Sequence, residues 1–221
     1  TPLQMATGAS VLAAGGLLRQ VHSIHSITSP DGLSIFKADP NQGAKQGIAP
    51  KVAFIMDQIM SDDGNRQAIF GRGSNLTLPD RKVASKTGTT EDYRDGWTVG
   101  FTPALATAFW FGNPDFSQMP VGAEASEVAA PVWHQFMQYA TTTVLQEPGG
   151  DWFAEPAGLD HYNVAGKLQW FLPGTNPGTP QPPLPPGVKV NAPKPPTPAA
   201  TPPPGGGNGA GHGGGGGGGG G

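Results

Sequence analysis

Lys86, Thr87, Gly88 and Thr89 follow a short apolar run and stand where a strand is expected to end. A lysine supplies a fixed positive charge, which favours a carboxylate ligand and lowers the cost of deprotonating a neighbouring hydroxyl group. Threonine hydroxyls can donate hydrogen bonds to the same carboxylate. A glycine between them leaves the strand surface bare, so a ligand backbone can approach closely. These residue types could serve a carboxylate ligand on an extended backbone, and they also fit an ordinary solvated strand end.

Two other kinds of site contain similar letters, and the sequence argues against both. A phosphate-binding P-loop needs Gly-x-x-x-x-Gly-Lys-Ser/Thr between a strand and a helix, whereas Ser85 precedes Lys86 here. The phosphorylated ion pumps resemble this stretch, but they carry a nucleophilic aspartate at the position of Ser85. For the bare tetrapeptide, the remaining alternative is a solvated strand end without a function.

Periodicity predicts the elements that must position these residues. Residues 1–16 indicate a helix, because Thr1 and Gln4 form a capping box around Pro2 and two glycines end the segment. Alternation over residues 17–38 favours a hairpin that turns at Asp31-Gly32. Further segments show helical or strand periodicity: a helix at 49–63 with Val52, Ile55, Met56, Ile59 and Met60 on its apolar face, strands at 82–88, 97–101 and 104–112, and a helix at 127–140 with Pro131 near its start. This order predicts an α/β arrangement with an antiparallel sheet.

The stretch KVASKTGTTEDYRDGWTVGFTPALATAFWFGNPD, residues 82–115, carries a family resemblance. It resembles the Lys-Thr-Gly strand and the following strands of bifunctional, class A, high-molecular-weight penicillin-binding proteins. Residues 1–16 resemble an earlier helix of the same transpeptidase domain, and the resemblance extends from about Thr1 to Ala140. It implies part of a penicillin-binding/β-lactamase-like serine transpeptidase fold, with an antiparallel sheet flanked by helices.

The resemblance implies acyl transfer between peptidoglycan stem peptides, with β-lactams as mimics of the donor. Lys86, Thr87, Gly88 and Thr89 would bind the substrate at a sheet edge, to which an extended peptide can add as a new strand. Lys86 would also act in catalysis, and the amide of Thr89 would form half of the oxyanion hole. No metal and no organic cofactor is implied.

Two further motifs of that family, Ser-x-x-Lys and Ser-x-Asn, have no match at the expected places. The string Ser34-Ile35-Phe36-Lys37 follows an Asp-Gly turn and alternates like a strand, so it is interpreted as chance. Ser74 and Asn75 are adjacent and do not form Ser-x-Asn. We therefore expect a C-terminal part of a transpeptidase domain, inactive alone, whose nucleophile, glycosyltransferase domain and membrane anchor lie upstream of Thr1. The resemblance also implies the extracytoplasmic face of the bacterial cell membrane.

Two alternatives stay open for the function. One is a hydrolase of the same fold, either a β-lactamase or a D,D-carboxypeptidase, in which water takes the acyl group. The other is a non-catalytic module that binds wall peptides through the same strand. The fate of an acylated serine separates the first alternative from a transpeptidase, and the absence of any such serine in the full-length gene product would favour the second.

Composition excludes several other classes. The formal net charge is −3 and 13% of the 221 residues are charged, so no basic stripe is available for nucleic acid. The chain has no cysteine, which excludes disulfides and thiolate metal sites. No apolar run approaches about 18 residues, the length of a spanning helix. Contact with a membrane is therefore expected only through upstream sequence.

Composition also suggests three regions along the chain. Residues 1–147 are expected to form the C-terminal part of the transpeptidase domain, and residues 148–172 an irregular extension. Residues 173–221 are rich first in proline and then in glycine, which is typical of a disordered tail. Within the first region, Glu91, Asp92 and Asp95 are expected to be solvated charges at a hairpin tip.

Overall fold

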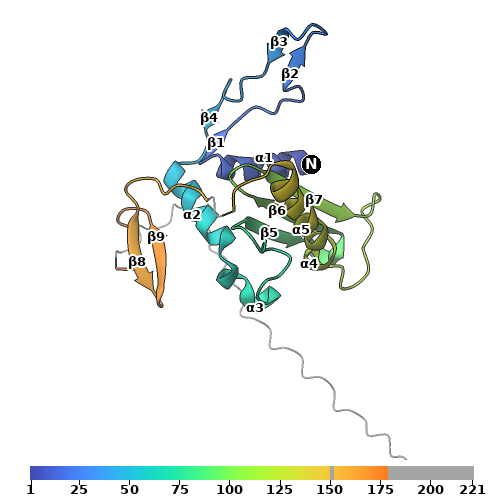
Figure 1. Ribbon diagram of the computed structural model, residues 1–221. Helices are drawn as coiled ribbons and strands as arrows, with labels where there is room; N and C mark the ends of the chain where they lie inside the picture. Colours follow the sequence, from blue (N-terminus) through green and yellow to red (C-terminus); the bar gives the residue numbers. More distant parts are fainter. Residues whose placement is uncertain (150–151, 179–221) are drawn as a thin grey trace, which may run out of the picture. The chain divides into compact units, whose positions relative to one another are not determined.

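The computed structural model describes residues 1–149 and 152–178, so most of the expected tail, residues 179–221, lies outside the described residues (Figure 1). The helical elements of the described part are α1 (Pro2–Ala13), α2 (Pro50–Ser61), a 3₁₀ turn (Asp63–Asn65), α3 (Gln67–Phe70), a second 3₁₀ turn (Glu91–Tyr93), α4 (Ala125–Val128), α5 (Ala130–Tyr139) and a π-helical turn (Ala140–Val144). The strands are β1 (Leu17–Leu18), β2 (Ser26–Thr28), β3 (Ser34–Lys37), β4 (Lys45–Gln46), β5 (Ala84–Thr89), β6 (Asp95–Phe101), β7 (Ala106–Gly112), β8 (Asp160–Val164) and β9 (Lys167–Phe171).

The central sheet has three antiparallel strands in the order β5-β6-β7 (Figure 1). The register pairs Thr87 with Thr98, and Trp97 with Trp110. Helix α1 packs on β6 and β7, whereas α4 and α5 contact the same sheet through other residues. The expected α/β arrangement, with helices flanking an antiparallel sheet, is confirmed.

Alternation along β6 decides which helices cover which face. Phe101 packs with Ala9 of α1 on one side. Gly100, one residue earlier, lies under Trp133 of α5, and a Cβ atom there would stand 2.3 Å from the Trp133 ring. The indole of Trp133 is fully buried and donates a 2.9 Å hydrogen bond to Thr107 Oγ1. The absence of a side chain at Gly100 therefore lets α5 approach the sheet.

Helix α1 begins as the sequence predicts. Thr1 is the N-cap, its hydroxyl accepts from the Gln4 amide, and the Gln4 side chain completes the capping box. The chain leaves the helix at Gly15 and Gly16, which both have positive φ. At Gly16 a Cβ atom would stand 1.9 Å from the carbonyl oxygen of Ile48, so this glycine permits a close backbone crossing.

The apolar face predicted for α2 coincides only partly with the buried one. Ile55 and Met60 are half-buried, whereas Val52, Met56 and Ile59 are exposed. The fully buried positions of the helix are Ala53, Phe54 and Asp57. The ring of Phe54 packs edge-on against Trp170 of β9, at 5.9 Å between centroids. The buried stripe lies one residue, or about 100°, from the predicted one. The buried stripe contains Asp57, so it is less hydrophobic than the neighbouring stripe. A search for apolar periodicity therefore identifies the neighbouring stripe.

Asp57 is the buried acid of this interface. Its side chain is 1% exposed, and its Oδ1 atom has no hydrogen-bond partner among the described residues. Burial raises the pKa of Asp57 to about 7, against the opposing effect of the Lys82 ammonium group. Lys82 itself donates to Gln58 Oε1 at 2.6 Å and lies over the Trp152 ring.

This burial predicts a pH-dependent stability. Because the pKa of Asp57 is higher in the folded chain than the ordinary value of 3.8, folding takes up a proton between the two pKa values. The free energy of unfolding should fall as the pH rises from 4 to about 7, by at most about 4 kcal/mol, and then stay level. Urea unfolding at several pH values measures this slope. Asp57→Asn should remove it and stabilise the chain at pH 8; a slope that survives the substitution would assign it to another group.

The remaining strands form two-stranded pairs that are separate from the central sheet. The predicted hairpin at Asp31-Gly32 is confirmed, since β2 pairs with β3 on either side of this turn. The irregular extension expected for residues 148–172 is not irregular throughout, because β8 and β9 form a second hairpin there. Its turn is Ala165-Gly166, with positive φ at both residues. Alanine rarely adopts this conformation, so the sequence carries no ordinary turn signal.

Candidate active site

Strand β5 is an edge strand in the part of the chain that the structure describes, since it pairs only with β6. The Thr90 amide donates to the Asp95 carbonyl at 3.1 Å, which makes these two residues a hydrogen-bonded pair. Antiparallel ladders alternate between hydrogen-bonded and non-hydrogen-bonded pairs. The N–H and C=O groups of Gly88 therefore point toward β6, and those of Thr87 and Thr89 point to the open edge.

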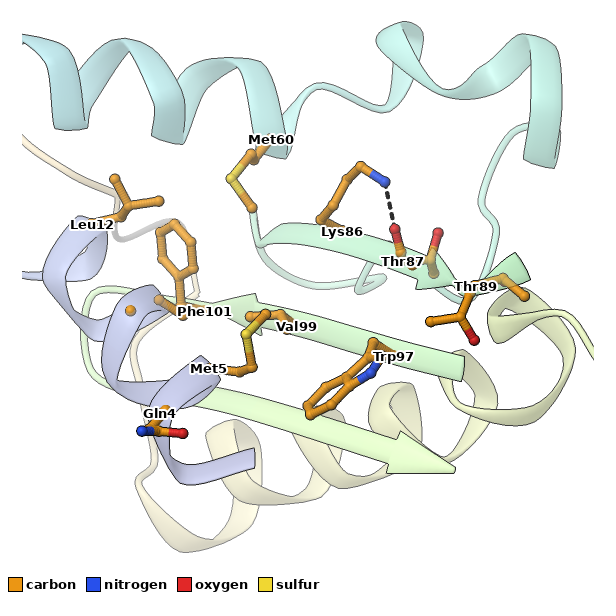
Figure 2. A pocket seen from close by; sticks show the side chains of 14 residues that line it. Gln4, Met5, Leu12, Met60, Lys86, Thr87, Thr89, Trp97, Val99 and Phe101 are labelled. Carbon is orange, nitrogen blue, oxygen red and sulfur yellow. Dashed lines mark hydrogen bonds between the residues drawn. The ribbon is translucent and has the colours of Figure 1, made fainter. Parts of the chain in front are cut away.

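Lys86 and Gly88 direct their substituents to one face of the strand, opposite Val99 and Trp97 of β6. Figure 2 shows the Lys86 side chain at the rim of a cavity between α1, the end of α2 and the sheet, with its ammonium group donating to the Thr87 carbonyl oxygen. The cavity has a volume of about 620 Å³. Its lining is mostly apolar and includes Met5, Ala9, Leu12, Met60, Lys86, Thr87, Gly88, Thr89, Trp97, Val99 and Phe101.

The two threonines have different surroundings. The hydroxyl oxygen of Thr89 accepts a 2.9 Å hydrogen bond from the Ala125 amide at the start of α4. This contact anchors the end of β5 to the helix behind it, and what Thr89 presents at the edge is its backbone. Thr87 is buried, and it borders both the large cavity and a smaller one of about 270 Å³ along the strand edge.

Gly88 leaves the strand surface bare, as its residue type predicts. A Cβ atom at this position would meet only the Trp97 Cβ, at an ordinary contact distance of 3.9 Å. The fold therefore has room for a side chain at Gly88. The four residues of the sequence motif thus lie together at one sheet edge: a cation, two outward-facing backbone segments and a surface without a side chain.

Other residues of interest in the sequence lie elsewhere or have other roles. Ser34 is in β3 and does not line the cavity, in agreement with its strand-like alternation. Asp92 is exposed, as expected for a hairpin tip. Asp95 corrects the same expectation, because it is 7% exposed and its Oδ2 atom accepts from the Trp110 indole at 3.1 Å. Its burial follows from the β6–β7 pairing, which single residues do not reveal.

Sequence reasoning missed the residues that complete the cavity from other elements. Gln4 and Met5 contribute from α1, and Met60 from the end of α2 (Figure 2). Trp97 of β6 is half-buried and lines the cavity as well.

The family model "Penicillin binding protein transpeptidase domain" matches residues 1–138. The chain belongs to this family. The expected fold is therefore confirmed, and the Lys-Thr-Gly-Thr strand lies inside the matched part of this penicillin-binding transpeptidase domain.

Relatives and solved structures agree with the family. Penicillin-binding protein 1A of Neisseria cinerea is 35% identical over 148 residues, which are 63% of this chain and 18% of the relative. The crystal structure of penicillin-binding protein 1A from Haemophilus influenzae superposes with a TM-score of 0.65 at 22% identity, over 80% of this chain and 32% of that one. PonA1 from Mycobacterium tuberculosis in complex with penicillin V gives 0.53 at 25% identity, over 70% and 40%.

The chain thus spans about a fifth of the length of the curated relatives. Within its described residues, every helix is too short or too polar to cross a membrane. The penicillin-binding domain is represented here by its Lys-Thr-Gly strand, the two strands beside it and the helices that cover them.

Proposed function

We propose that this chain supplies the donor-binding strand and half of the oxyanion hole of a serine D,D-transpeptidase. The observation that carries the proposal is the open edge of β5, where the Thr89 amide points outward beside the Lys86 ammonium group. A stem peptide would add to this edge as an antiparallel strand. Membership of the penicillin-binding family supports acyl transfer as the reaction.

In the proposed reaction, a serine outside this chain attacks the carbonyl carbon of the penultimate D-Ala. The C–N bond to the terminal D-Ala breaks, and that residue leaves as the amine with the proton of the serine. An amine of a second stem peptide then attacks the ester, forms the cross-link and releases the serine. The Thr89 amide would hydrogen-bond the oxyanion formed in both steps, and one such donor is worth about 3 kcal/mol.

The other roles at the strand follow from charge and space. Lys86 would stabilise the terminal carboxylate of the donor and lower the pKa of a hydroxyl group beside it. Thr87 would donate a hydrogen bond to the same carboxylate. Gly88 would let the donor backbone lie against the strand. β-Lactams would occupy this site because their ring amide and carboxylate repeat the donor's arrangement.

The proposed substrate also implies a cellular location for the site. Stem peptides of the wall lie outside the cytoplasmic membrane, so we propose an extracytoplasmic location. Anchoring and any glycosyltransferase activity would belong to parts of the gene product outside these 221 residues.

Labelled penicillin tests the proposal. The full-length gene product should take up about one label per molecule, on a serine of a Ser-x-x-Lys sequence. The 221-residue chain alone should remain unlabelled, and Ser34→Ala should change nothing in either protein. Stoichiometric labelling of Ser34, or a full-length product without any labelled serine, would contradict the proposal; the latter result favours a binding module.

The fate of the acyl group distinguishes a transpeptidase from a hydrolase. With a D-Ala-D-Ala peptide and an added acceptor amine, a transpeptidase should divide its product between amide and acid according to the amine concentration. A hydrolase should give acid alone and should release penicillin within seconds. Liquid chromatography of the products measures this ratio directly.

A further inference from the structure

Arg66 lies against the open edge of β5, although it belongs to the turn between α2 and α3. Its Nη1 atom donates to the Ser85 carbonyl oxygen at 3.2 Å and to Ser85 Oγ at 2.7 Å. The same nitrogen lies 3.0 Å from the carbonyl oxygen of Met60, and Nε lies 3.4 Å from Asp63 Oδ1. The Arg66 side chain is 11% exposed. This guanidinium therefore joins the end of α2, the turn after it and the strand edge.

Ser85 has the same backbone orientation as Thr87 and Thr89, because it also belongs to a non-hydrogen-bonded pair of the β5–β6 ladder. It is the first outward-facing position of the strand. Arg66 occupies its carbonyl group, and the Ser85 hydroxyl donates to the Leu76 carbonyl at 2.7 Å. Of the three outward-facing positions, Ser85 is closed by the largely buried Arg66. The Thr87 carbonyl accepts from the exposed Lys86 of the same strand, and Thr89 remains open.

A cavity beside this edge is also bounded by Arg66. A cavity of about 270 Å³ runs along the strand and is bordered by Arg66, Ser85, Lys86 and Thr87. Arg66 is part of its wall at the Ser85 end. A peptide that entered here could pair with Thr89, and also with Thr87 once the exposed Lys86 ammonium group turned from the Thr87 carbonyl to the peptide carboxylate. Pairing with Ser85 would require the largely buried Arg66 guanidinium to leave.

We propose that Arg66 is a positioning residue that closes the edge of β5 at Ser85 and so fixes the register of the bound donor peptide. This inference rests on the function proposed above. A shift to the next equivalent register moves the peptide by two residues, or about 7 Å. Such a shift takes the scissile carbonyl away from the Thr89 amide, and misplacement by even about 1 Å can cost a factor of about 100 in rate.

The contacts explain why the residue is an arginine. A planar guanidinium offers several donors in a fixed geometry, and here it reaches acceptors on three separate segments. A lysine has its donors on a single nitrogen, so it could replace the Nη1 contacts to Met60 and Ser85 but not the Nε contact to Asp63 at the same time. Arg66→Lys should therefore restore part of the register control lost in Arg66→Ala.

Kinetics of the full-length gene product on a stem pentapeptide test the proposal. In Arg66→Ala, unproductive registers should compete with the productive one, which lowers kcat and KM together by about 5-fold to 10-fold. The ratio kcat/KM and the rate of penicillin acylation should stay within about 3-fold. Arg72→Ala, an exposed arginine on the neighbouring loop, is the matched control and should change neither constant. A fall in kcat/KM, acylation and Tm together would make Arg66 a purely structural residue, and unchanged kcat and KM would also overturn the proposal.

Hydrogen exchange at single-residue resolution gives a readout that does not depend on turnover. In the wild-type protein, the pentapeptide should slow exchange of the Thr87 and Thr89 amides but not further slow that of Ser85. In Arg66→Ala, protection should extend to Ser85 by at least about 5-fold. Equal patterns in the two proteins would overturn the role of Arg66. Absence of penicillin labelling with this exchange pattern intact would instead overturn the proposed reaction alone.

Discussion

Replacing Lys86 by alanine should slow penicillin acylation of the full-length gene product by about 100-fold to 1000-fold. The ammonium group is the one cation on the cavity lining, and its position at the strand edge is fixed by a hydrogen bond to the Thr87 carbonyl oxygen. Its removal takes away the charge that favours the donor carboxylate and lowers the pKa of a neighbouring hydroxyl group. Losses of this size are typical when one preorganised electrostatic contact is removed. Stopped-flow acylation with a fluorescent penicillin measures the rate.

Lys37→Ala provides the control for this prediction. Lys37 is an exposed lysine at the end of β3 and does not line the cavity. Its removal changes the net charge by the same amount and should leave the acylation rate within about 2-fold. Equal rates for the wild-type protein and Lys86→Ala, with unchanged Tm, would exclude Lys86 from the reaction.

Two glycine-to-alanine substitutions should separate function from folding. At Gly88 the added methyl group meets only Trp97 Cβ at 3.9 Å, so the free energy of unfolding should change by less than about 1 kcal/mol. The methyl group would nevertheless stand where the donor backbone is expected, and acylation should slow by about 10-fold or more. At Gly100 the added atom would lie 2.3 Å from Trp133 Cζ2 and 2.7 Å from the Ala84 carbonyl oxygen. That overlap should cost about 3 kcal/mol or more.

Urea unfolding gives the free energy of unfolding of each variant, and stopped-flow kinetics gives its acylation rate. Gly88→Ala should be stable and react slowly, whereas Gly100→Ala should be unstable and its remaining folded fraction should react at the normal rate. A Gly88→Ala protein that reacts normally would show that the donor does not lie against this part of β5.

Where signals are local, the sequence predicts the structure well. The Thr1–Gln4 capping box and the alternation around Lys86 place α1 and β5 close to their actual ends, because a helix cap and a strand pattern depend on neighbouring residues. The Lys-Thr-Gly-Thr motif was found for the same reason. Its four residues are consecutive, and the fold has only to leave one edge of the strand open.

Where partners come from distant segments, the sequence predicts less. The hydrophobic pattern does not reveal the buried stripe of α2, because that stripe contains an acid, Asp57. The β8–β9 hairpin was missed because Ala165-Gly166 is a weak turn signal. Arg66 has no local signal at all. Its relation to Ser85 exists only because folding brings a turn after α2 to the edge of β5.

The most direct test of the central claim is a crystal structure of the full-length gene product acylated by penicillin. The carbonyl oxygen of the acyl group should lie about 3 Å from the Thr89 nitrogen. The penicillin carboxylate should lie beside Thr87 and Lys86. An acyl carbonyl held by other donors, with the open edge of β5 unoccupied, would contradict the assignment of this strand as the donor site.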